Sequence, residues 1–201
     1  MKIDSKPARF LVALVAVFCW NTALSHAVSE KFEGKIYSGG PLKPLDSRTQ
    51  LKVGDPAPDF TLPSLSGEKV TLSDFLGKKN VVLSFVPAAW TPVCSEQWPG
   101  YNLVKDYFDQ YQAVILGITV DNLATLHAWT QQMGGVWFPV LSDFWPHGAV
   151  AAKYGVLRSE GTSERAVFVI DKQGIIRYMD VHDINRRPNL EAMIDELRKL
   201  P

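Results

Sequence analysis

Short apolar segments alternate with helix-like segments along most of the chain, and this alternation constrains the fold more than any other feature. Strand-like apolar runs occupy residues 81–86, 113–119, 137–141, 166–170 and 175–181. Helical periodicity lies between or after them, over residues 124–133, 149–154 and 190–200. Strands that alternate with helices predict an α/β domain in which helices flank a mixed central sheet.

The flanking sequence refines this prediction. The segment DFTLPSLSGEKVTL has apolar runs on both sides of Ser66-Gly67, which predicts an N-terminal β-hairpin. Asp121 and Asn189 are expected to cap the helices that follow them. This order of elements fits a thioredoxin-like fold over residues 51–201, and residues 28–50 are expected to form an irregular arm or tether.

The first 27 residues have the pattern of a secretory signal peptide. Lys2, Lys6 and Arg9 precede an apolar stretch that is shorter than the ~20 residues of a membrane-spanning helix. A small-residue site, Ser25-His26-Ala27, follows. We expect cleavage after Ala27 and export, to the periplasm in a Gram-negative bacterium and otherwise by secretion. The alternative is an uncleaved anchor.

Removal of this leader changes both the charge and the cysteine content. The full chain has no net charge, and the leader holds three basic residues and one acidic residue, so the mature chain has a net charge of −2. This balance argues against a nucleic acid or an anionic membrane as a partner. Cys19 leaves with the leader, so Cys94 becomes the only cysteine and no intramolecular disulfide is expected.

Cys94 ends the segment PAAWTPVC, which follows the apolar run VVLSFV. Thr91 is a favourable helix N-cap and Pro92 a favourable first helical residue, so Cys94 is expected in the first helical turn. Backbone N–H groups and the helix dipole there favour the thiolate over the thiol. The alternative is a small buried hydrophobic residue without chemistry.

Pro87, Thr91 and Cys94 match the active-site pattern of the peroxiredoxins, and Gln97 stands where that family often has Glu or Gln. The likeness extends through VGDPAPDFTL, LSDFWPHG and ERAVFVIDKQGIIRY. The chain therefore resembles the alkyl hydroperoxide reductase/thiol-specific antioxidant family, and within it the one-cysteine type similar to the bacterioferritin-comigratory group. The resemblance implies an enzyme without a cofactor, in which Cys94 reduces a hydroperoxide and becomes a sulfenic acid.

The resemblance also assigns roles around Cys94. Arg165 would hold the thiolate and polarise a peroxide oxygen, because arginine stays charged and offers several fixed donors. The Thr91 hydroxyl would bind the peroxide, Pro87 would shape the pocket, and Val93 and Gln97 would contribute to substrate binding. The alternatives are an ordinary surface arginine at Arg165 and a simple cap at Thr91.

The route back from the sulfenic acid is expected to need an outside thiol. Some relatives carry a second cysteine five residues after the first, but that position is Pro99 here. We therefore expect recycling by a thioredoxin-like or glutaredoxin-like protein or by a small thiol such as glutathione. The Pro99-Gly100 pair is expected to weaken the helix and to let its first turn loosen. A homodimer is possible in this family.

Two other functions are alternatives to a peroxidase. WTPVC is similar to the WCxxC motif of thioredoxin-like thiol–disulfide oxidoreductases, but Thr91 takes the place of the first cysteine and no proline stands just before AVFVI. A non-catalytic binding module on the same fold would tolerate the loss of Thr91 or Arg165. No metal is expected, because His127, His147 and His182 lack metal-ligand spacing.

Overall fold

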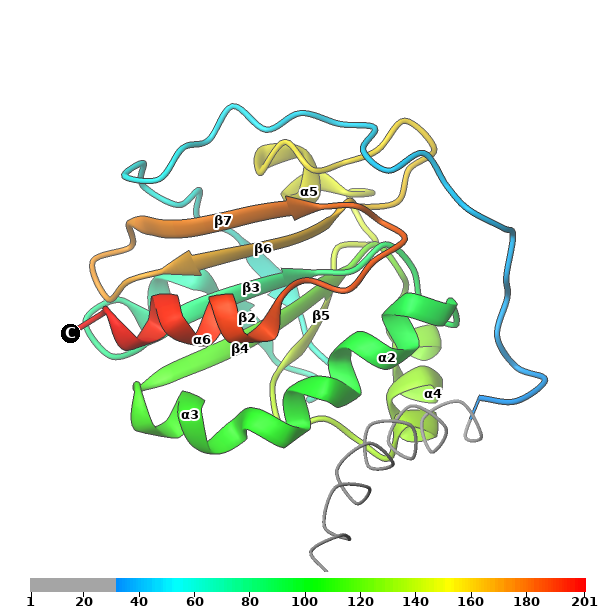
Figure 1. Cartoon of the computed structure of the whole chain (residues 1–201), viewed down its shortest axis with the longest axis horizontal. Coiled ribbons are helices and arrows are strands. Elements are labelled where there is room, and N and C mark those ends of the chain that lie inside the picture. Colours follow the sequence, from blue (N-terminus) through cyan, green and yellow to red (C-terminus); the bar gives the residue numbers. More distant parts are fainter. Residues whose placement is uncertain (1–31) are drawn as a thin grey trace, which may run out of the picture.

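A five-stranded mixed sheet forms the centre of the molecule (Figure 1) in the computed structural model, which describes residues 32–201. In spatial order its strands are β5 (Val140–Ser142), β4 (Ala113–Thr119), β3 (Asn80–Phe85), β6 (Arg165–Ile170) and β7 (Ile176–His182). The strands β3, β4 and β5 are parallel, whereas β6 is antiparallel to β3 and β7 is antiparallel to β6. The predicted thioredoxin-like α/β fold is confirmed.

Helices and a hairpin cover the two faces of this sheet. One face carries α2 (Pro92–Tyr101), α3 (Lys105–Gln110), α4 (Leu123–Met133) and α6 (Leu190–Arg198). The other face carries α5 (Ala149–Lys153), the hairpin of β1 (Thr61–Pro63) and β2 (Lys69–Thr71), and the short 3-10 helix η1 (Leu72–Phe75). A second 3-10 helix, η2 (Asn102–Val104), joins α2 to α3. The predicted N-terminal hairpin is thus present.

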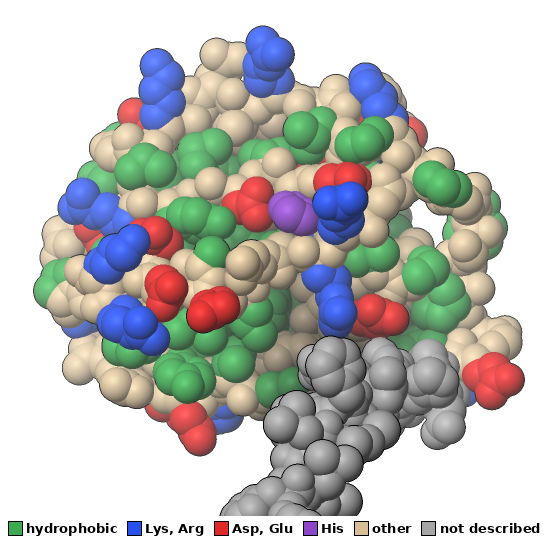
Figure 2. Space-filling view, in the orientation of Figure 1, with side chains coloured by type: hydrophobic (Ala, Val, Ile, Leu, Met, Phe, Trp, Pro, Cys, Tyr) green, Lys and Arg blue, Asp and Glu red, His purple; other side chains and the backbone are tan. Residues whose placement is uncertain are grey.

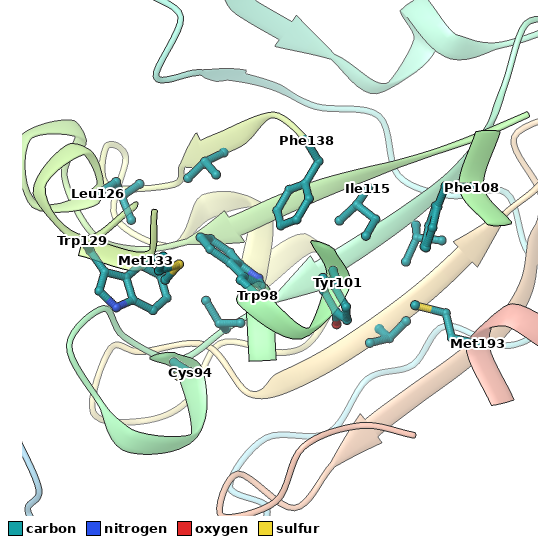
Figure 3. Packing of buried hydrophobic residues seen from close by; sticks show 14 of the residues in the cluster. Cys94, Trp98, Tyr101, Phe108, Ile115, Leu126, Trp129, Met133, Phe138 and Met193 are labelled. Carbon is teal, nitrogen blue, oxygen red and sulfur yellow. The ribbon is translucent and has the colours of Figure 1, made fainter. Parts of the chain in front are cut away.

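Each central strand is apolar on both sides because both sheet faces are covered. In β3, Val82 packs under the four helices, whereas Val81 and Leu83 face the hairpin and α5. The helical side holds a cluster of large aromatic side chains, among them Trp98 and Trp129, and Cys94 lies at its border (Figure 3). The site cysteine is therefore set into a rigid, well-packed core.

A glycine lets α2 approach the sheet closely. Trp98 of α2 packs over Gly117 of β4, and a Cβ atom at Gly117 would lie 2.8 Å from the Trp98 ring. Trp98 is fully buried, and its indole N–H donates to the Ser84 hydroxyl of β3 at 3.3 Å. This contact fixes the distance between α2 and the strands below it.

Residues 32–50 form an arm without helix or strand, which follows the outside of the domain (Figure 1, blue to cyan). Its Phe32 side chain is buried, and the Tyr37 amide donates to the Trp90 carbonyl at 2.8 Å. Further along, the Pro44 carbonyl accepts from the Ile184 amide at 3.1 Å. The arm therefore packs against the domain at several points. The predicted signal peptide, residues 1–27, lies outside the described residues.

Several predicted boundaries differ from the structure. The cap of α4 is Asn122, whose side chain accepts from the Thr125 amide at 3.0 Å, so the prediction of Asp121 as the cap is wrong. The strand expected over residues 137–141 begins only at Val140, because the preceding Trp137 points toward α2 and donates to the Tyr101 carbonyl. The sequence pattern did not predict α3 as a separate helix.

Neither a membrane-spanning helix among residues 32–201 nor a large area of one charge on the face seen in Figure 2 is present. Across residues 32–201, every helix is too short or too polar to cross a bilayer. Basic and acidic side chains alternate over the face seen in Figure 2.

Candidate active site

The candidate site begins with the sulfur of Cys94 in the first turn of α2. Thr91 occupies the N-cap position and Pro92 the first helical position, as the sequence predicts. The Cys94 side chain is fully buried. It therefore lies below the molecular surface and not in an open cleft.

Arg165, the first residue of β6, reaches the same sulfur from the sheet. Its Nη2 lies 3.4 Å from Cys94 Sγ, while Nε and Nη2 also donate to the Ile184 carbonyl at 3.1 and 2.9 Å. Its Nη1 donates to Gln97 Oε1 at 2.5 Å. Only 2% of Arg165 is exposed, and these partners include no carboxylate. A buried cation in such surroundings favours an anion at its remaining donor position.

Gln97 connects Arg165 to a buried polar group beneath α2. The guanidinium only donates, so the Gln97 amide must point its oxygen at Arg165 and its nitrogen the other way. That nitrogen donates to Tyr101 Oη at 2.9 Å and to Ser84 Oγ at 3.2 Å. Burial raises the pKa of Tyr101, so its phenol stays neutral. These contacts leave Gln97 one orientation, and that orientation supports the arginine.

The loop before α2 is held in an uncommon conformation. Trp90 has a φ of +60°, which turns the chain sharply into the helix. The Thr91 hydroxyl donates to the Ala88 carbonyl at 2.9 Å and does not bond to the helix amides, so its expected capping hydrogen bond is missing. Asp121 Oδ2 accepts from the Ala89 amide at 2.8 Å. Asp121 therefore anchors this loop.

A cavity of about 800 Å³ lies above Arg165 and the start of α2. Four predicted site residues line it: Pro87, Thr91, Val93 and Arg165. Its other walls come from the arm, from loop residues 158–162 and from residues 184–185 after β7. Cys94 and Gln97 lie behind this lining. The structure thus brings all six predicted site residues together.

These features match a known family. The AhpC/TSA family matches residues 53–179 of the chain. The chain belongs to the AhpC/TSA family. It is an AhpC/TSA peroxiredoxin, a thiol-dependent peroxidase.

Relatives of this peroxiredoxin come from several groups of organisms. It is 40% identical over 135 residues to the alkyl hydroperoxide reductase E of Mycobacterium tuberculosis, which covers 65% of this chain and 86% of the relative. It is 31% identical to a chloroplastic 2-cysteine peroxiredoxin of Chattonella marina, over 75% of this chain and 80% of the relative.

Solved structures agree with the fold. The peroxidoxin BcpB of Mycobacterium tuberculosis superimposes with a TM-score of 0.67 at 28% identity, over 76% of this chain and 99% of BcpB. The reduced 2-Cys peroxiredoxin of Plasmodium vivax gives a TM-score of 0.68 at 27% identity, over 74% and 81% of the two chains.

None of the three histidines among residues 32–201 lines the cavity. His147 bonds to the Gly161 carbonyl at 2.7 Å, and His182 pairs with Asp180. Within residues 32–201, no group of three His, Cys, Asp or Glu side chains is arranged to hold a metal ion.

The sequence pattern assigns neither Asp121 nor the arm to the site. The sequence predicts Asp121 as a helix cap, and only its position two residues after the buried strand β4 hints at a role near the strand ends. The arm was left without a role because it has no periodicity, although residues 37–43 and Asp46 line the cavity.

Proposed function

We propose that Cys94 is the residue of this peroxidase that the hydroperoxide oxidises. We also propose that the protein is exported and that an external thiol reduces the oxidised cysteine. The observation that carries the proposal is the buried Arg165 guanidinium, which lies 3.4 Å from Cys94 Sγ and whose partners among residues 32–201 are a carbonyl, an amide oxygen and this sulfur. A thiolate would supply the missing negative charge. The nucleophilic form of the cysteine is thereby stabilised where a peroxide would meet it.

The reaction follows from this arrangement. The Cys94 thiolate attacks the terminal oxygen of the hydroperoxide, and a sulfur–oxygen bond forms as the oxygen–oxygen bond breaks. The electron pair of the broken bond leaves with the other oxygen, the one bonded to the organic group or to the second hydrogen, and this oxygen takes a proton from solvent and departs in an alcohol or as water. The sulfur is oxidised by two electrons to a sulfenic acid. Arg165 donors stabilise the charge as it moves to the departing oxygen.

The other residues position the reactants. The Thr91 hydroxyl lines the cavity and is free to rotate from the Ala88 carbonyl toward a bound peroxide. Pro87 and Val93 supply apolar lining to the cavity beside Arg165. Gln97 acts through Arg165, because its amide oxygen holds Nη1 of the guanidinium.

Recycling requires a second reactant. Cys94 is the only cysteine among residues 32–201, so within this part of the chain the sulfenic acid has no partner for a disulfide. A thiolate from a small molecule or another protein would attack the oxidised sulfur, release water and form a mixed disulfide. A second thiol would then release Cys94. Because the sulfur is buried, the first turn of α2 has to open for this step.

The proposal is tested on the protein purified with and without its first 27 residues. With one equivalent of hydrogen peroxide, mass spectrometry should find one added oxygen at Cys94. Peroxide consumption should stop near one equivalent without thiol and continue with glutathione or a thioredoxin-like protein. The matched pair is Cys94→Ser, which should abolish consumption, and Cys19→Ser in the full chain, which should preserve it. Equal consumption by Cys94→Ser and the unaltered protein would refute the assignment.

Export is tested separately. The leader pattern at residues 1–27 supports cleavage after Ala27, so N-terminal sequencing of the protein recovered from its natural cell should begin at Val28. An N-terminus at Met1 would refute cleavage and would point to a retained anchor.

A further inference from the structure

The arm forms one side of the active-site cavity although it precedes the segment that matches the family. The family match begins at residue 53, whereas residues 37–43 and Asp46 line the cavity above Arg165. The domain alone would leave this side open to solvent. The arm therefore decides the shape of the entrance.

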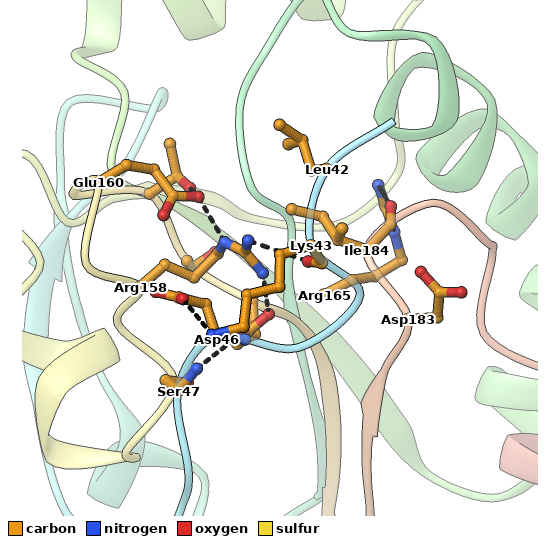
Figure 4. A network of polar contacts seen from close by, with 12 residues as sticks. Leu42, Lys43, Asp46, Ser47, Arg158, Glu160, Arg165, Asp183 and Ile184 are labelled. Atoms are coloured by element: carbon orange, nitrogen blue, oxygen red, sulfur yellow. Dashed lines mark hydrogen bonds and ion pairs between the residues drawn. The ribbon is translucent and has the colours of Figure 1, made fainter. Parts of the chain in front are cut away.

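A buried ion pair fixes one end of this wall. Glu164 is fully buried, and its Oε1 accepts from the amides of Asp46 and Ser47, both at 2.6 Å. Figure 4 shows Asp46 and Ser47 of the arm beside Arg158. Its Oε2 pairs with Arg158 Nη1 at 2.7 Å, and Arg158 Nη2 donates to the Lys43 carbonyl at 3.1 Å. The arm backbone is thus held by charged groups that are themselves buried.

The loop after β7 fixes the middle of the wall. The Leu42 amide donates to Asn185 Oδ1 at 3.0 Å, and the Leu42 carbonyl accepts from Asn185 Nδ2 at 2.9 Å. Both backbone groups of Leu42 are therefore bonded to one side chain. Its own side chain stays 48% exposed at the cavity wall. An exposed leucine on a fixed backbone is a ready contact for an apolar ligand.

The size of the cavity exceeds what hydrogen peroxide needs. Two oxygen atoms occupy about the volume of two water molecules, or roughly 60 Å³. The cavity of about 800 Å³ is in the range of sites for larger organic molecules. Hydrogen peroxide would therefore leave most of the cavity empty, whereas a substrate with a body attached to its peroxide group would fill more of it.

The walls indicate the chemistry of that body. Pro41 and Leu42 of the arm and Val93 and Ile184 of the domain supply apolar lining. The charged lining residues of the arm and of loop 158–162 are already paired, Lys43 with Asp46 at 2.9 Å and Arg158 with both Glu160 and the buried Glu164. An uncharged apolar group suits such a lining better than an anion or a cation.

We propose that Leu42 and the adjoining arm form a specificity wall that favours hydroperoxides carrying an apolar organic group over hydrogen peroxide. The proposal rests on the proposed function of Cys94. The organic group lies against the arm while the peroxide reaches down to Arg165 and Thr91. The Cys94 sulfur takes the terminal oxygen as above, and the organic part leaves as the alcohol after it takes a proton from solvent.

The test compares two peroxides in single turnovers without thiol, so that only oxidation of Cys94 is measured. The probes are cumene hydroperoxide and hydrogen peroxide. Leu42→Ala should lower the ratio of their second-order rate constants about tenfold, because apolar contact with the organic group is lost. Leu45→Ala is the matched control, since Leu45 lies on the same arm, is 46% exposed and is not part of the cavity lining. This control should leave the ratio unchanged.

A second variant, Asn185→Ala, tests the same wall without changing the Leu42 side chain. Asn185→Ala removes both bonds to the Leu42 backbone and should also lower the ratio, with the thermal unfolding temperature measured alongside. An unchanged ratio in Leu42→Ala, or an equal loss with both peroxides, would overturn the specificity wall. If the unaltered protein leaves Cys94 unoxidised by either peroxide, the proposed function fails first.

Discussion

Arg165 is a buried charged side chain at the candidate site. Its charge is buried, and its neighbours are a carbonyl, an amide oxygen and a sulfur. The cost of burying such a charge is lowest when the sulfur is ionised, so the arginine and the thiolate stabilise each other. The same geometry holds the guanidinium plane fixed toward the cavity.

Replacement of Arg165 by lysine tests this geometry. Lysine keeps the charge but has a single nitrogen, so it cannot reach Ile184, Gln97 and Cys94 together. We expect Arg165→Lys to slow oxidation of Cys94 about a hundredfold, as measured by peroxide consumption in a single turnover. Circular dichroism should show an intact fold. A rate near that of the unaltered protein would show that the charge alone is sufficient.

Gln97 offers a second test at the residue scale. Gln97→Glu would place a carboxylate beside Arg165 Nη1 and pair the charge that otherwise faces the sulfur. We expect oxidation of Cys94 to slow about tenfold, since an ion pair competes with the thiolate for the guanidinium. Gln110→Glu makes the same change at an exposed position of α3 and serves as the control. Equal rates for both variants would remove Gln97 from the site.

The sequence revealed those site residues that lie in a motif. Pro87, Thr91 and Cys94 stand at fixed spacing, and Arg165 begins a strand with a matching sequence, so all four were predictable. Asp121 was not, because its partner is the backbone amide of Ala89, which any residue type supplies. A contact between a side chain and a distant backbone amide leaves no paired signal in one sequence.

At the scale of elements, α2 is packed against the core on its inner face and contains a proline near its end. Its inner face is held by Trp98 under the sheet and by Ser95, whose hydroxyl accepts from the Trp129 indole at 3.0 Å. Pro99 lies inside the helix, so the Ser95 carbonyl lacks its usual helical donor. The predicted weakening by Pro99-Gly100 does not end the helix, which continues to Tyr101.

Gly100→Ala tests whether opening of α2 limits recycling. No atom lies within 4 Å of a Cβ at this position, so the change should stabilise the protein by about 0.5–1 kcal/mol. We expect formation of the mixed disulfide from the sulfenic acid to slow, because the first turn opens less often. Oxidation by peroxide in the same variant is the internal control and should keep its rate. Faster mixed-disulfide formation would contradict this view of α2.

The elements themselves were predictable where burial is continuous. The strands β3, β4 and β6 are apolar on both faces, so their runs are visible in the sequence to within a residue. Short elements such as α3 were not, since a helix of six residues shows little periodicity. Trp137 was assigned to a strand by its neighbours, but its indole packs toward α2.

At the scale of the whole molecule, the attachment of the arm should depend on pH in a defined direction. Hydrogen bonds from Ser159, and then Lys43, lower the pKa of Asp46. A lowered carboxyl pKa stabilises the folded state above the ordinary value, near 3.9, and this contribution is lost as the pH falls through the folded-state value. The attachment should therefore persist throughout neutral and mildly acidic solution.

Hydrogen exchange at the Ser159 amide measures this attachment, because that amide donates to Asp46 Oδ2 at 2.8 Å. After correction for intrinsic exchange, its protection should be equal at pH 7 and pH 5. Asp46→Ala should reduce it at both values, and Asp74→Ala, a change at an exposed carboxylate, should not. Loss of protection between pH 7 and pH 5 in the unaltered protein would contradict the lowered pKa.

Ile184 connects the arm to the active-site arginine through its backbone groups. Its amide holds the Pro44 carbonyl, while its own carbonyl holds two donors of Arg165. The position of the wall and the position of the Arg165 guanidinium therefore both depend on Ile184. Any redesign of the arm for a bulkier substrate will shift the charged group as well, so substrate range and reaction rate will not vary independently unless this one backbone bridge is preserved.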